Sequence, residues 1–241
     1  MKIKLMSFNI QHGRNYNFPA EDIIDLSLMA NVIEAEGADI VGLNEVRGEG
    51  PHPGYTDQAK EIAEKLGYHY FFAPAIHIEG HGPYGNALIS KYPIVSGEIV
   101  PIPDPADRIN GRGFETRCIL KAVIDVAGTQ LTVLVTHFGL NPSEAENAAI
   151  TVVKELANTY APKVLMGDFN LEPDSPVLDR IRILMADTAD MFKEQKLSFP
   201  SDNPSRKIDY ILVSDDITVV EADIPEIVAS DHRPHTAVIE I

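Results

Sequence analysis

Apolar and polar positions along the chain follow two different periods. Residues Ile3 to Asn9 alternate, with Ile3 and Leu5 on one face, which is typical of a β-strand. Residues 25–36 instead repeat apolar side chains at intervals of three and four, which predicts an amphipathic helix. Asp25 can cap the start of this helix and Gly37 can end it. Both kinds of element therefore occur within the first 40 residues.

The same reading extends to the rest of the chain. Further strands are predicted over residues 40–43, 68–73, 87–90, 116–126, 130–136, 164–166, 208–213, 217–221 and 236–241. Further helices are predicted over residues 58–66, from Ser143 to about Thr159, and after Ser175-Pro176. The turn Ala127-Gly128-Thr129 joins two of the strands as a β-hairpin. Interspersed helices and strands with a hairpin indicate an α/β protein with a mixed sheet.

Two stretches show neither period. Residues 76–86 contain His77 and His81 among glycines, and residues 101–113 contain Arg108 and Arg112. Both are expected to be long irregular loops. Long loops in compact domains are often functional, so both are candidates for contact with a substrate.

Composition narrows the class of protein. The 241 residues are 44% hydrophobic and 23% charged, which excludes a mainly disordered chain. The formal net charge of −16 argues against a long duplex DNA as partner, because such a surface repels phosphate backbones. The single cysteine, Cys118, is expected to be a buried structural thiol, and it fits a reducing compartment. With no signal peptide or membrane span recognised, the expected location is cytoplasmic.

Small polar residues recur where apolar strands begin or end. Because neighbouring strand ends can meet at one edge of a sheet, these side chains are candidates for one cluster. The candidates are Asn9, Glu45, His137, Asp168, Asn170, Asp209, Asp231 and His232. Each residue alone also has an ordinary interpretation, as a turn residue, a helix cap, a surface charge or a core histidine. Six strand ends that all carry such groups favour a common site.

The residue types in this set indicate a particular chemistry. Carboxylates and amides without cysteine are hard oxygen ligands, which suit Mg²⁺ or Mn²⁺. Histidines beside carboxylates suit proton transfer or contact with a charged oxygen. Because Mg²⁺ usually shares its ligand shell with a substrate phosphate, the combination predicts hydrolysis of a phosphate ester or diester.

The ordered set of motifs resembles the endonuclease/exonuclease/phosphatase superfamily, which includes deoxyribonuclease I. The matching stretches are Ser7-Phe8-Asn9-Ile10, Leu43-Asn44-Glu45-Val46, Gly85-Asn86-Ala87-Leu88-Ile89-Ser90, Thr136-His137, Gly167-Asp168-Phe169-Asn170, Lys207-Ile208-Asp209-Tyr210-Ile211 and Ser230-Asp231-His232. They follow the family's order from one end of the chain to the other. The resemblance implies a four-layer α/β sandwich, with two mixed β-sheets face to face and helices outside. It also implies one domain over residues 1–241, with its site at one end.

The resemblance implies a metal side to the site. Glu45 is similar to the family's principal metal-binding glutamate, and Asn9 would lie beside it and assist the metal or its water. Asp231 resembles an additional acidic residue near the metal. Arg117 resembles a supporting arginine of some branches, although a cross-strand ion pair explains it equally well.

The remaining motif residues would serve the water and the phosphate. Asp168 would align or deprotonate the attacking water, and Asn170 would hold a phosphate oxygen. His232 would contact the phosphate or act as the base, with Asp209 fixing its tautomer. His137 would stabilise developing charge or protonate the leaving group. The sequence leaves the identity of the base open.

Departures from the family pattern narrow the range of expected substrates. Asn44 stands where many members have glutamine, and Thr136-His137 resembles the deoxyribonuclease I, lipid, small-molecule and RNA-tail branches more than the abasic-site endonucleases. The chain also has no tryptophan.

The leading hypothesis is a Mg²⁺- or Mn²⁺-dependent phosphodiesterase on a small, lipid-headgroup or short nucleotide substrate. The alternatives are an endo- or exonuclease on DNA or RNA, and a non-catalytic binding module. Arg14, Arg47, Arg108, Arg112 and Arg117 could supply local positive charge, and His77 and His81 could line the mouth.

Overall fold

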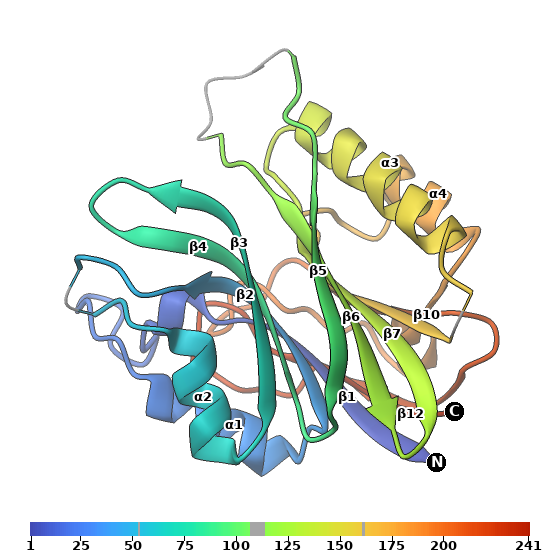
Figure 1. The fold of residues 1–241 in the computed structure, drawn as a ribbon, viewed down its shortest axis with the longest axis horizontal. Coiled ribbons are helices and arrows are strands. Elements are labelled where there is room, and N and C mark those ends of the chain that lie inside the picture. The colour runs from blue at the N-terminus through green and yellow to red at the C-terminus, as the bar shows by residue number, and fades with distance from the viewer. Residues whose placement is uncertain (53, 107–113, 161) are drawn as a thin grey trace.

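The computed structural model describes residues 1–52, 54–106, 114–160 and 162–241, which form two six-stranded sheets (Figure 1). The first sheet has the order β11-β12-β1-β2-β4-β3 and the second β5-β6-β7-β8-β10-β9. The first comprises β1 (Lys2–Asn9), β2 (Ile40–Arg47), β3 (His69–Ile78), β4 (Gly82–Ser90), β11 (Thr218–Asp223) and β12 (His235–Glu240). The second comprises β5 (Ile94–Pro101), β6 (Cys118–Val126), β7 (Thr129–His137), β8 (Lys163–Asp168), β9 (Ala186–Asp187) and β10 (Asp209–Val213).

Helices cover the outer face of each sheet. They are α1 (Leu26–Glu36), α2 (Gln58–Leu66), α3 (Pro142–Ala157) and α4 (Pro176–Arg182), with short 3₁₀ turns η1 (Gln11–Gly13) and η2 (Thr188–Met191). Within the described part of the chain, no helix is long and apolar enough to cross a membrane.

Alternating side chains produce three hydrophobic layers. On β1, Ile3 and Leu5 point into the core between the sheets, whereas Met6 and Phe8 point outward beneath α1 and α2. On the second sheet, outward-facing side chains such as Leu165 pack beneath α3 and α4. Both sheets are mixed, since β1 pairs with β2 and β7 with β8 in parallel while their other pairings are antiparallel. The predicted four-layer α/β sandwich is confirmed.

The predicted caps hold for the first two helices and fail for the third. Asp25 accepts a hydrogen bond from the Leu28 amide, and Gly37 ends α1 in a left-handed conformation. Helix α3 begins at Pro142, so its cap is Asn141 and the partner is Glu144, not the predicted Ser143 and Glu146. Proline suits the first helical position because it has no N–H to satisfy, and the cap therefore lies two residues earlier than predicted.

Two expectations about irregular segments were wrong or incomplete. Residues 76–86 form most of a β-hairpin, because β3 extends to Ile78 and β4 begins at Gly82. Residues 102–106 have no regular structure, as expected, and residues 107–113 lie outside the described part of the chain.

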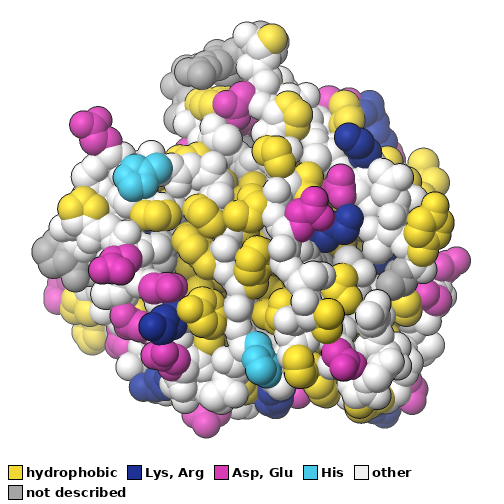
Figure 2. Space-filling model, in the orientation of Figure 1, with side chains coloured by type: hydrophobic (Ala, Val, Ile, Leu, Met, Phe, Trp, Pro, Cys, Tyr) yellow, Lys and Arg dark blue, Asp and Glu magenta, His cyan; other side chains and the backbone are white. Residues whose placement is uncertain are grey.

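Strand β5 was missed because it lies at a sheet edge and most of its side chains are exposed. Val95 is 58% exposed and Ile99 is 42% exposed, so no buried apolar alternation marks the strand. Figure 2, drawn in the orientation of Figure 1, shows hydrophobic side chains gathered near the middle of the face toward the viewer.

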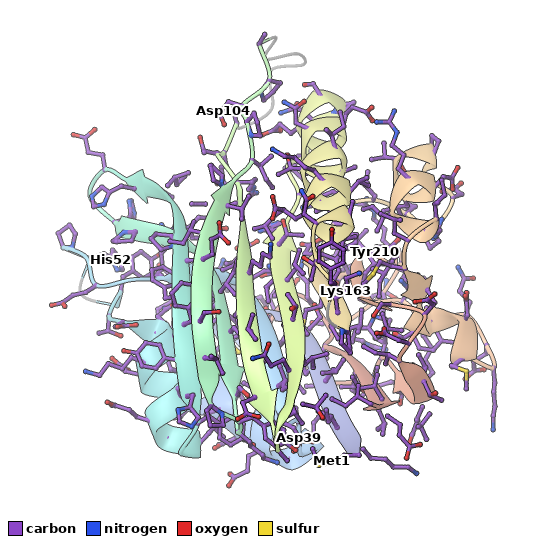
Figure 3. The ribbon with its side chains drawn as sticks, turned by 45° about the vertical axis from the view of Figure 1, so that its right-hand side comes forward. Met1, Asp39, His52, Asp104, Lys163 and Tyr210 are labelled. Carbon is purple, nitrogen blue, oxygen red and sulfur yellow. The ribbon has the colours of Figure 1, made fainter. Side chains whose placement is uncertain are left out.

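Strand register brings the predicted polar residues to one end of the sandwich. Asp168 lies beside His137 on the parallel neighbour β7 and opposite Asp209 on the antiparallel neighbour β10. In the other sheet, Asn9 ends β1 beside Asn44 of β2. Figure 3 shows Met1 and Asp39, from which β1 and β2 start, at the opposite end of the molecule from Asp104.

Gly167 makes the pairing of β7 with β8 possible just before Asp168. Its φ is +147°, and a Cβ there would lie 1.8 Å from the carbonyl oxygen of Thr136. No side chain can relieve this contact, because the opposing atom belongs to the backbone. Only glycine therefore permits the register that places His137 beside Asp168.

We predict that Gly167→Ala lowers the free energy of unfolding by more than about 3 kcal/mol, since it combines an unfavourable φ with a backbone clash. Gly128→Ala is the matched control. Gly128 also has a positive φ, of +93°, but nothing lies within 4 Å of its added Cβ. It should cost only about 1 kcal/mol. Urea denaturation compares the two, and equal losses would contradict the prediction.

His235 begins β12 in a fully buried position behind Asp209. Its Nδ1 lies 3.2 Å from the carbonyl oxygen of Asp209, and its Nε2 lies 3.1 Å from the hydroxyl of Thr188. Burial, followed by the positive charge of Lys207, lowers the pKa of His235 from 6.5 to about 4. The folded state therefore holds a neutral ring with Nδ1–H donating to the carbonyl.

This burial predicts a pH dependence of stability. Between about pH 6.5 and pH 4 the unfolded chain binds a proton at this residue that the folded chain does not, so stability falls as pH falls. The contribution is present above pH 6.5 and declines by about 3 kcal/mol by pH 4. The free energy of unfolding, measured by denaturation at several pH values, should lack this decline in His235→Gln. The substitution His77→Gln, at an exposed histidine, should retain it. An unchanged slope in His235→Gln would refute the assignment.

Candidate active site

The predicted polar residues surround a cavity of about 340 Å³ at this end of the sandwich. Its wall includes seven of the nine predicted site residues, namely Glu45, Arg117, His137, Asp168, Asn170, Asp231 and His232. Asn9 and Asp209 are fully buried behind the wall and bond to residues that line it. The structure thus brings the nine candidates together from both sheets.

Asp168 lies at the centre of the cluster. Its Oδ2 accepts a hydrogen bond of 3.1 Å from the Asn9 amide, and its Oδ1 accepts one of 2.9 Å from the backbone N–H of Asn170. The same Oδ2 lies 3.5 Å from His137 Nε2 and 3.6 Å from His232 Nε2. Burial raises the pKa of Asp168 to about 7, and His232 opposes that rise. A carboxyl with such a pKa can exchange a proton near neutral pH.

His232 is held as a cation by carboxylates. Its Nδ1 lies 2.9 Å from Asp209 Oδ2, so Nδ1–H donates to that oxygen and the ring presents Nε2 to the cavity. Burial alone would lower the pKa of His232, but the charges of Asp209 and Asp168 outweigh burial and raise the pKa to about 10. Nε2 therefore carries a proton and can donate to an anionic oxygen.

His137 is in the opposite protonation state. Burial, and then the positive charges of Arg117 and His232, hold the pKa of His137 well below its usual value. Arg117 can only donate, so its NH1 donates to His137 Nδ1 over 3.2 Å and the ring proton lies on Nε2. That Nε2 lies 3.1 Å from Asn170 Nδ2. Asn170 Nδ2 also donates to the carbonyl oxygen of Phe138 over 3.1 Å. Arg117 also pairs with Glu115 at 2.9 Å; because Glu115 lies two residues earlier in the chain, this ion pair is local and not the expected cross-strand pair.

Glu45 lies in a strained part of β2. A bulge interrupts the pairing with β4 between Leu43 and Val46, and Glu45 has a φ of +59°. Such a conformation costs a non-glycine residue about 1–3 kcal/mol and is common at functional sites. The Asn9 amide donates to Glu45 Oε1 over 3.0 Å. The other carboxylate oxygen remains available at the cavity wall, which Asp231 also lines.

The residues fit a divalent metal by their donor chemistry. Glu45 and Asp231 offer carboxylate oxygens at the cavity, and burial raises the pKa of Asp231 to about 6. The carboxylates of Asp168 and Asp209 lie together behind these oxygens, in a group with His232 whose atoms are within 4.8 Å of one another. Among the described residues, Asp209 Oδ1 is buried without a hydrogen-bond partner. Hard oxygen donors of this kind suit Mg²⁺ or Mn²⁺.

Asn44, the departure from the family pattern, lies between the sheets. Its Nδ2 donates to Asn86 Oδ1 over 2.8 Å and to the Thr136 carbonyl over 3.0 Å, while its Oδ1 accepts from the Asp168 N–H over 2.9 Å. It therefore positions Asp168 and does not reach the cavity.

Several other candidates lie away from the cavity. His77 is exposed on β3, and His81 lies at the hairpin turn, where its ring stacks against His52 at 5.7 Å. Arg14 pairs with Asp22 at 3.9 Å. Arg47 is buried between the rings of Tyr55 and Tyr84. Arg108 and Arg112 lie outside the described residues. Cys118 is buried as expected, and burial raises the pKa of its thiol to about 12.

Tyr84 lies in the cavity wall, within the stretch 76–86 that was a candidate for contact with a substrate. Sequence reasoning missed other residues of the wall, including Leu140, Phe199 and Arg206. Tyr84 hydrogen-bonds with Arg117, which places it beside His137. Phe199 packs against the His232 ring at 4.8 Å. Leu140 comes three residues after His137, and this nearness to a motif is the signal in the sequence that could have found it.

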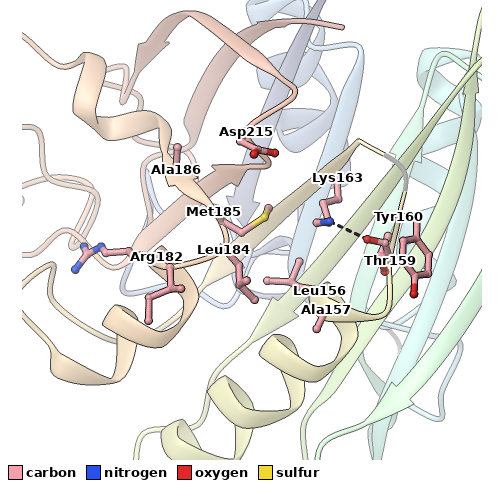
Figure 4. A pocket seen from close by; sticks show the side chains of 11 residues that line it. Leu156, Ala157, Thr159, Tyr160, Lys163, Arg182, Leu184, Met185, Ala186 and Asp215 are labelled. Carbon is pink, nitrogen blue, oxygen red and sulfur yellow. Dashed lines mark hydrogen bonds between the residues drawn. The ribbon is translucent and has the colours of Figure 1, made fainter.

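A larger cavity of about 590 Å³ lies near the start of β8, at the other end of that strand from Asp168 (Figure 4). Lys163 turns toward Thr159 there and donates to its carbonyl oxygen over 2.8 Å. Asp215 is the one carboxylate among its lining residues. The titratable cluster therefore assigns the chemistry to the smaller cavity.

Comparisons with known proteins agree with this geometry. The model of the Endonuclease/Exonuclease/phosphatase family matches residues 6–232. A protein of that description from Beutenbergia cavernae is 25% identical, with a TM-score of 0.76 over 100% of this chain and 72% of its own.

Two more distant structures share the fold. A mannosyl-6-phosphatase of Bacteroides thetaiotaomicron is 16% identical, with a TM-score of 0.80 over 99% of this chain and 100% of its own. The human nocturnin catalytic domain, solved with a bound sulfate anion, is 20% identical, with a TM-score of 0.72 over 99% and 93%. With its family motifs spanning both sheets and meeting at one cavity, the chain belongs to the endonuclease/exonuclease/phosphatase family of phosphoester hydrolases.

Proposed function

We propose that the protein is a Mg²⁺- or Mn²⁺-dependent phosphodiesterase that acts on a small, lipid-headgroup or short nucleotide substrate. The observation that carries this proposal is the position of Asp168, whose Oδ2 lies within 3.6 Å of both His137 and His232. Membership of a phosphoester hydrolase family supports the reaction class. A cytoplasmic location fits the single buried cysteine.

Glu45 and Asp231 would hold the metal, with Asn9 orienting Glu45 through its 3.0 Å hydrogen bond. A bound divalent cation supplies charge stabilisation for the phosphate and the attacking water. The protein's own contribution is then the placement of donors and one proton acceptor around the reacting phosphorus.

Asp168 is the proposed base. Its pKa of about 7 lets it take the proton of an attacking water, and the Asn170 N–H and the Asn9 amide fix its two oxygens. His232 Nε2–H would donate to a phosphate oxygen, because Asp209 keeps that ring charged. Of the two roles left open for His232, its protonation favours phosphate contact.

His137 and Asn170 would hold a second phosphate oxygen. Their nitrogens lie 3.1 Å apart at the cavity wall and each carries a proton, so a phosphate oxygen in contact with both nitrogens would accept a hydrogen bond from each. His137 is neutral with its proton on Nε2, which favours stabilisation of developing charge over proton donation to the leaving group.

The substrate proposal rests on charge and size. The net charge of −16 repels an extended polyanion, while the cavity of about 340 Å³ accommodates one phosphate with a modest esterified group.

A substrate panel tests the function. We expect turnover of an aryl phosphodiester with Mg²⁺ or Mn²⁺, and its loss in chelator. Asp168→Asn preserves the shape of the side chain but removes the proton acceptor, so kcat should fall by a factor of about 10³ in a protein that remains folded. Phosphomonoester, phospholipids and oligonucleotides complete the panel. Activity that survives in chelator or in Asp168→Asn would reject the mechanism, and a steep salt dependence on oligonucleotides would indicate a nuclease.

Two substitutions distinguish a role of Arg117 at His137 from a role in its ion pair with Glu115. We predict that Arg117→Met lowers kcat/KM about 100-fold, because the His137 tautomer loses its donor and the pKa of His137 rises. Glu115→Gln keeps the guanidinium and should change kcat/KM less than about threefold. Steady-state kinetics on the best panel substrate measures both, and comparable losses would assign Arg117 to the ion pair.

A further inference from the structure

Gln58 links two backbone segments behind the predicted metal-binding carboxylate. It is the first residue of α2, and its side chain is fully buried. Its Nε2 donates to the carbonyl oxygen of His12 over 2.6 Å, and its Oε1 accepts from the N–H of Arg47 over 2.9 Å. Both ends of this amide are therefore used between segments that are far apart in the sequence.

The two linked segments are the strained ones on the metal side of the cavity. Gln11 and His12 have φ values of +44° and +49°, and Glu45 has a φ of +59°. Left-handed conformations of non-glycine residues persist only where their surroundings hold them. Arg47, whose N–H bonds to Gln58, lies two residues beyond Glu45.

Asn9 completes a closed circuit of hydrogen bonds. Its Oδ1 accepts from the Gln11 N–H over 3.0 Å, and its Nδ2 donates to Glu45 Oε1 over 3.0 Å. The circuit thus runs from Glu45 through Asn9 to the η1 turn, and from that turn through Gln58 back to β2. Asn9 bonds to the carboxylate of Glu45, and Gln58 bonds to the backbone two residues further along the same strand.

We propose that Gln58 is a positioning residue that sets the geometry of Glu45 as a metal ligand, an inference that rests on the proposed metal-dependent function. Helix α2 does not need this side chain for its own start, because Asp57 already caps it by accepting from the Lys60 N–H. Gln58 lies outside the lining of the cavity, so it acts through the backbone of the η1 turn and of β2.

The test measures Mn²⁺ affinity directly, by titration calorimetry or by the electron paramagnetic resonance of free Mn²⁺. Gln58→Leu removes both hydrogen bonds at similar volume and should weaken Mn²⁺ binding about 10–100-fold, the range typical of residues that orient metal ligands. Gln58→Glu, as a carboxylate, keeps an acceptor for Arg47 but places an oxygen against the carbonyl oxygen of His12, so Mn²⁺ binding should be weakened in this variant as well. Ser214→Ala is the control, since Ser214 is buried and accepts from the Lys163 N–H at the far end of β8.

The outcomes separate this inference from the function on which it rests. Mn²⁺ affinity within twofold of wild type in folded Gln58→Leu would overturn the inference alone, as would an equal loss in Ser214→Ala. An unmodified protein that binds no Mn²⁺ would overturn both. Hydrogen exchange on the unmodified protein needs no variant: Mn²⁺ should slow exchange at the Gln11 and Arg47 amides at least fivefold more than at Lys163. Equal slowing would refute the circuit.

Discussion

The site depends on hydrogen bonds that cross from one sheet to the other. Asn44 of the first sheet accepts from the Asp168 N–H and donates to the Thr136 carbonyl, both in the second sheet. Asn9 makes a further crossing to the Asp168 carboxylate. Buried polar groups are costly unless they are paired, so these contacts penalise any sliding of one sheet over the other. An apolar core alone is non-directional and would not fix this alignment as closely.

Alignment of the sheets is what gives two histidines opposite charge states in one cavity. His137 and His232 both lie near Asp168, yet the pKa of one is held well below its usual value and that of the other is raised to about 10. Their partners explain the difference, because Arg117 faces His137 and Asp209 faces His232. Titratable groups with pKa values separated in this way mark acid and base roles. Asp209 lies on β10, next to the strand that carries Asp168, and Arg117 directly precedes β6, which pairs with the strand of His137.

Strands that face the hydrophobic cores, and the polar residues at their ends, could be predicted from the sequence. Burial on one face imposes the alternation seen at Ile3 and Leu5, and register then places the strand ends together. Strand β5 could not be predicted in this way, because its side chains are exposed at an edge. The cavity residues Tyr84 and Phe199 carry no motif, and their place depends on loop and hairpin geometry. The role of Gln58 could not be predicted either, because both of its hydrogen-bond partners are backbone atoms whose positions depend on the fold.

The charge of the whole chain differs from the charge of the groups that line the cavity, and this difference affects which ligands the cavity can bind. Arg117 and Arg206 line it, but each is paired with a glutamate, Glu115 or Glu172. Because each of these pairs is neutral as a whole, the surplus of acidic residues sets the sign of the field at the protein surface, and salt screens that field beyond about 8 Å at physiological ionic strength. Within the cavity wall, His137, Asn170 and His232 carry hydrogen-bond donors, and the two histidines are buried. A phosphate there gains several hydrogen bonds, whereas a second phosphate further along a polyanion meets repulsion. This contrast favours a substrate whose charge is confined to one phosphate group, without any steric block on longer ligands.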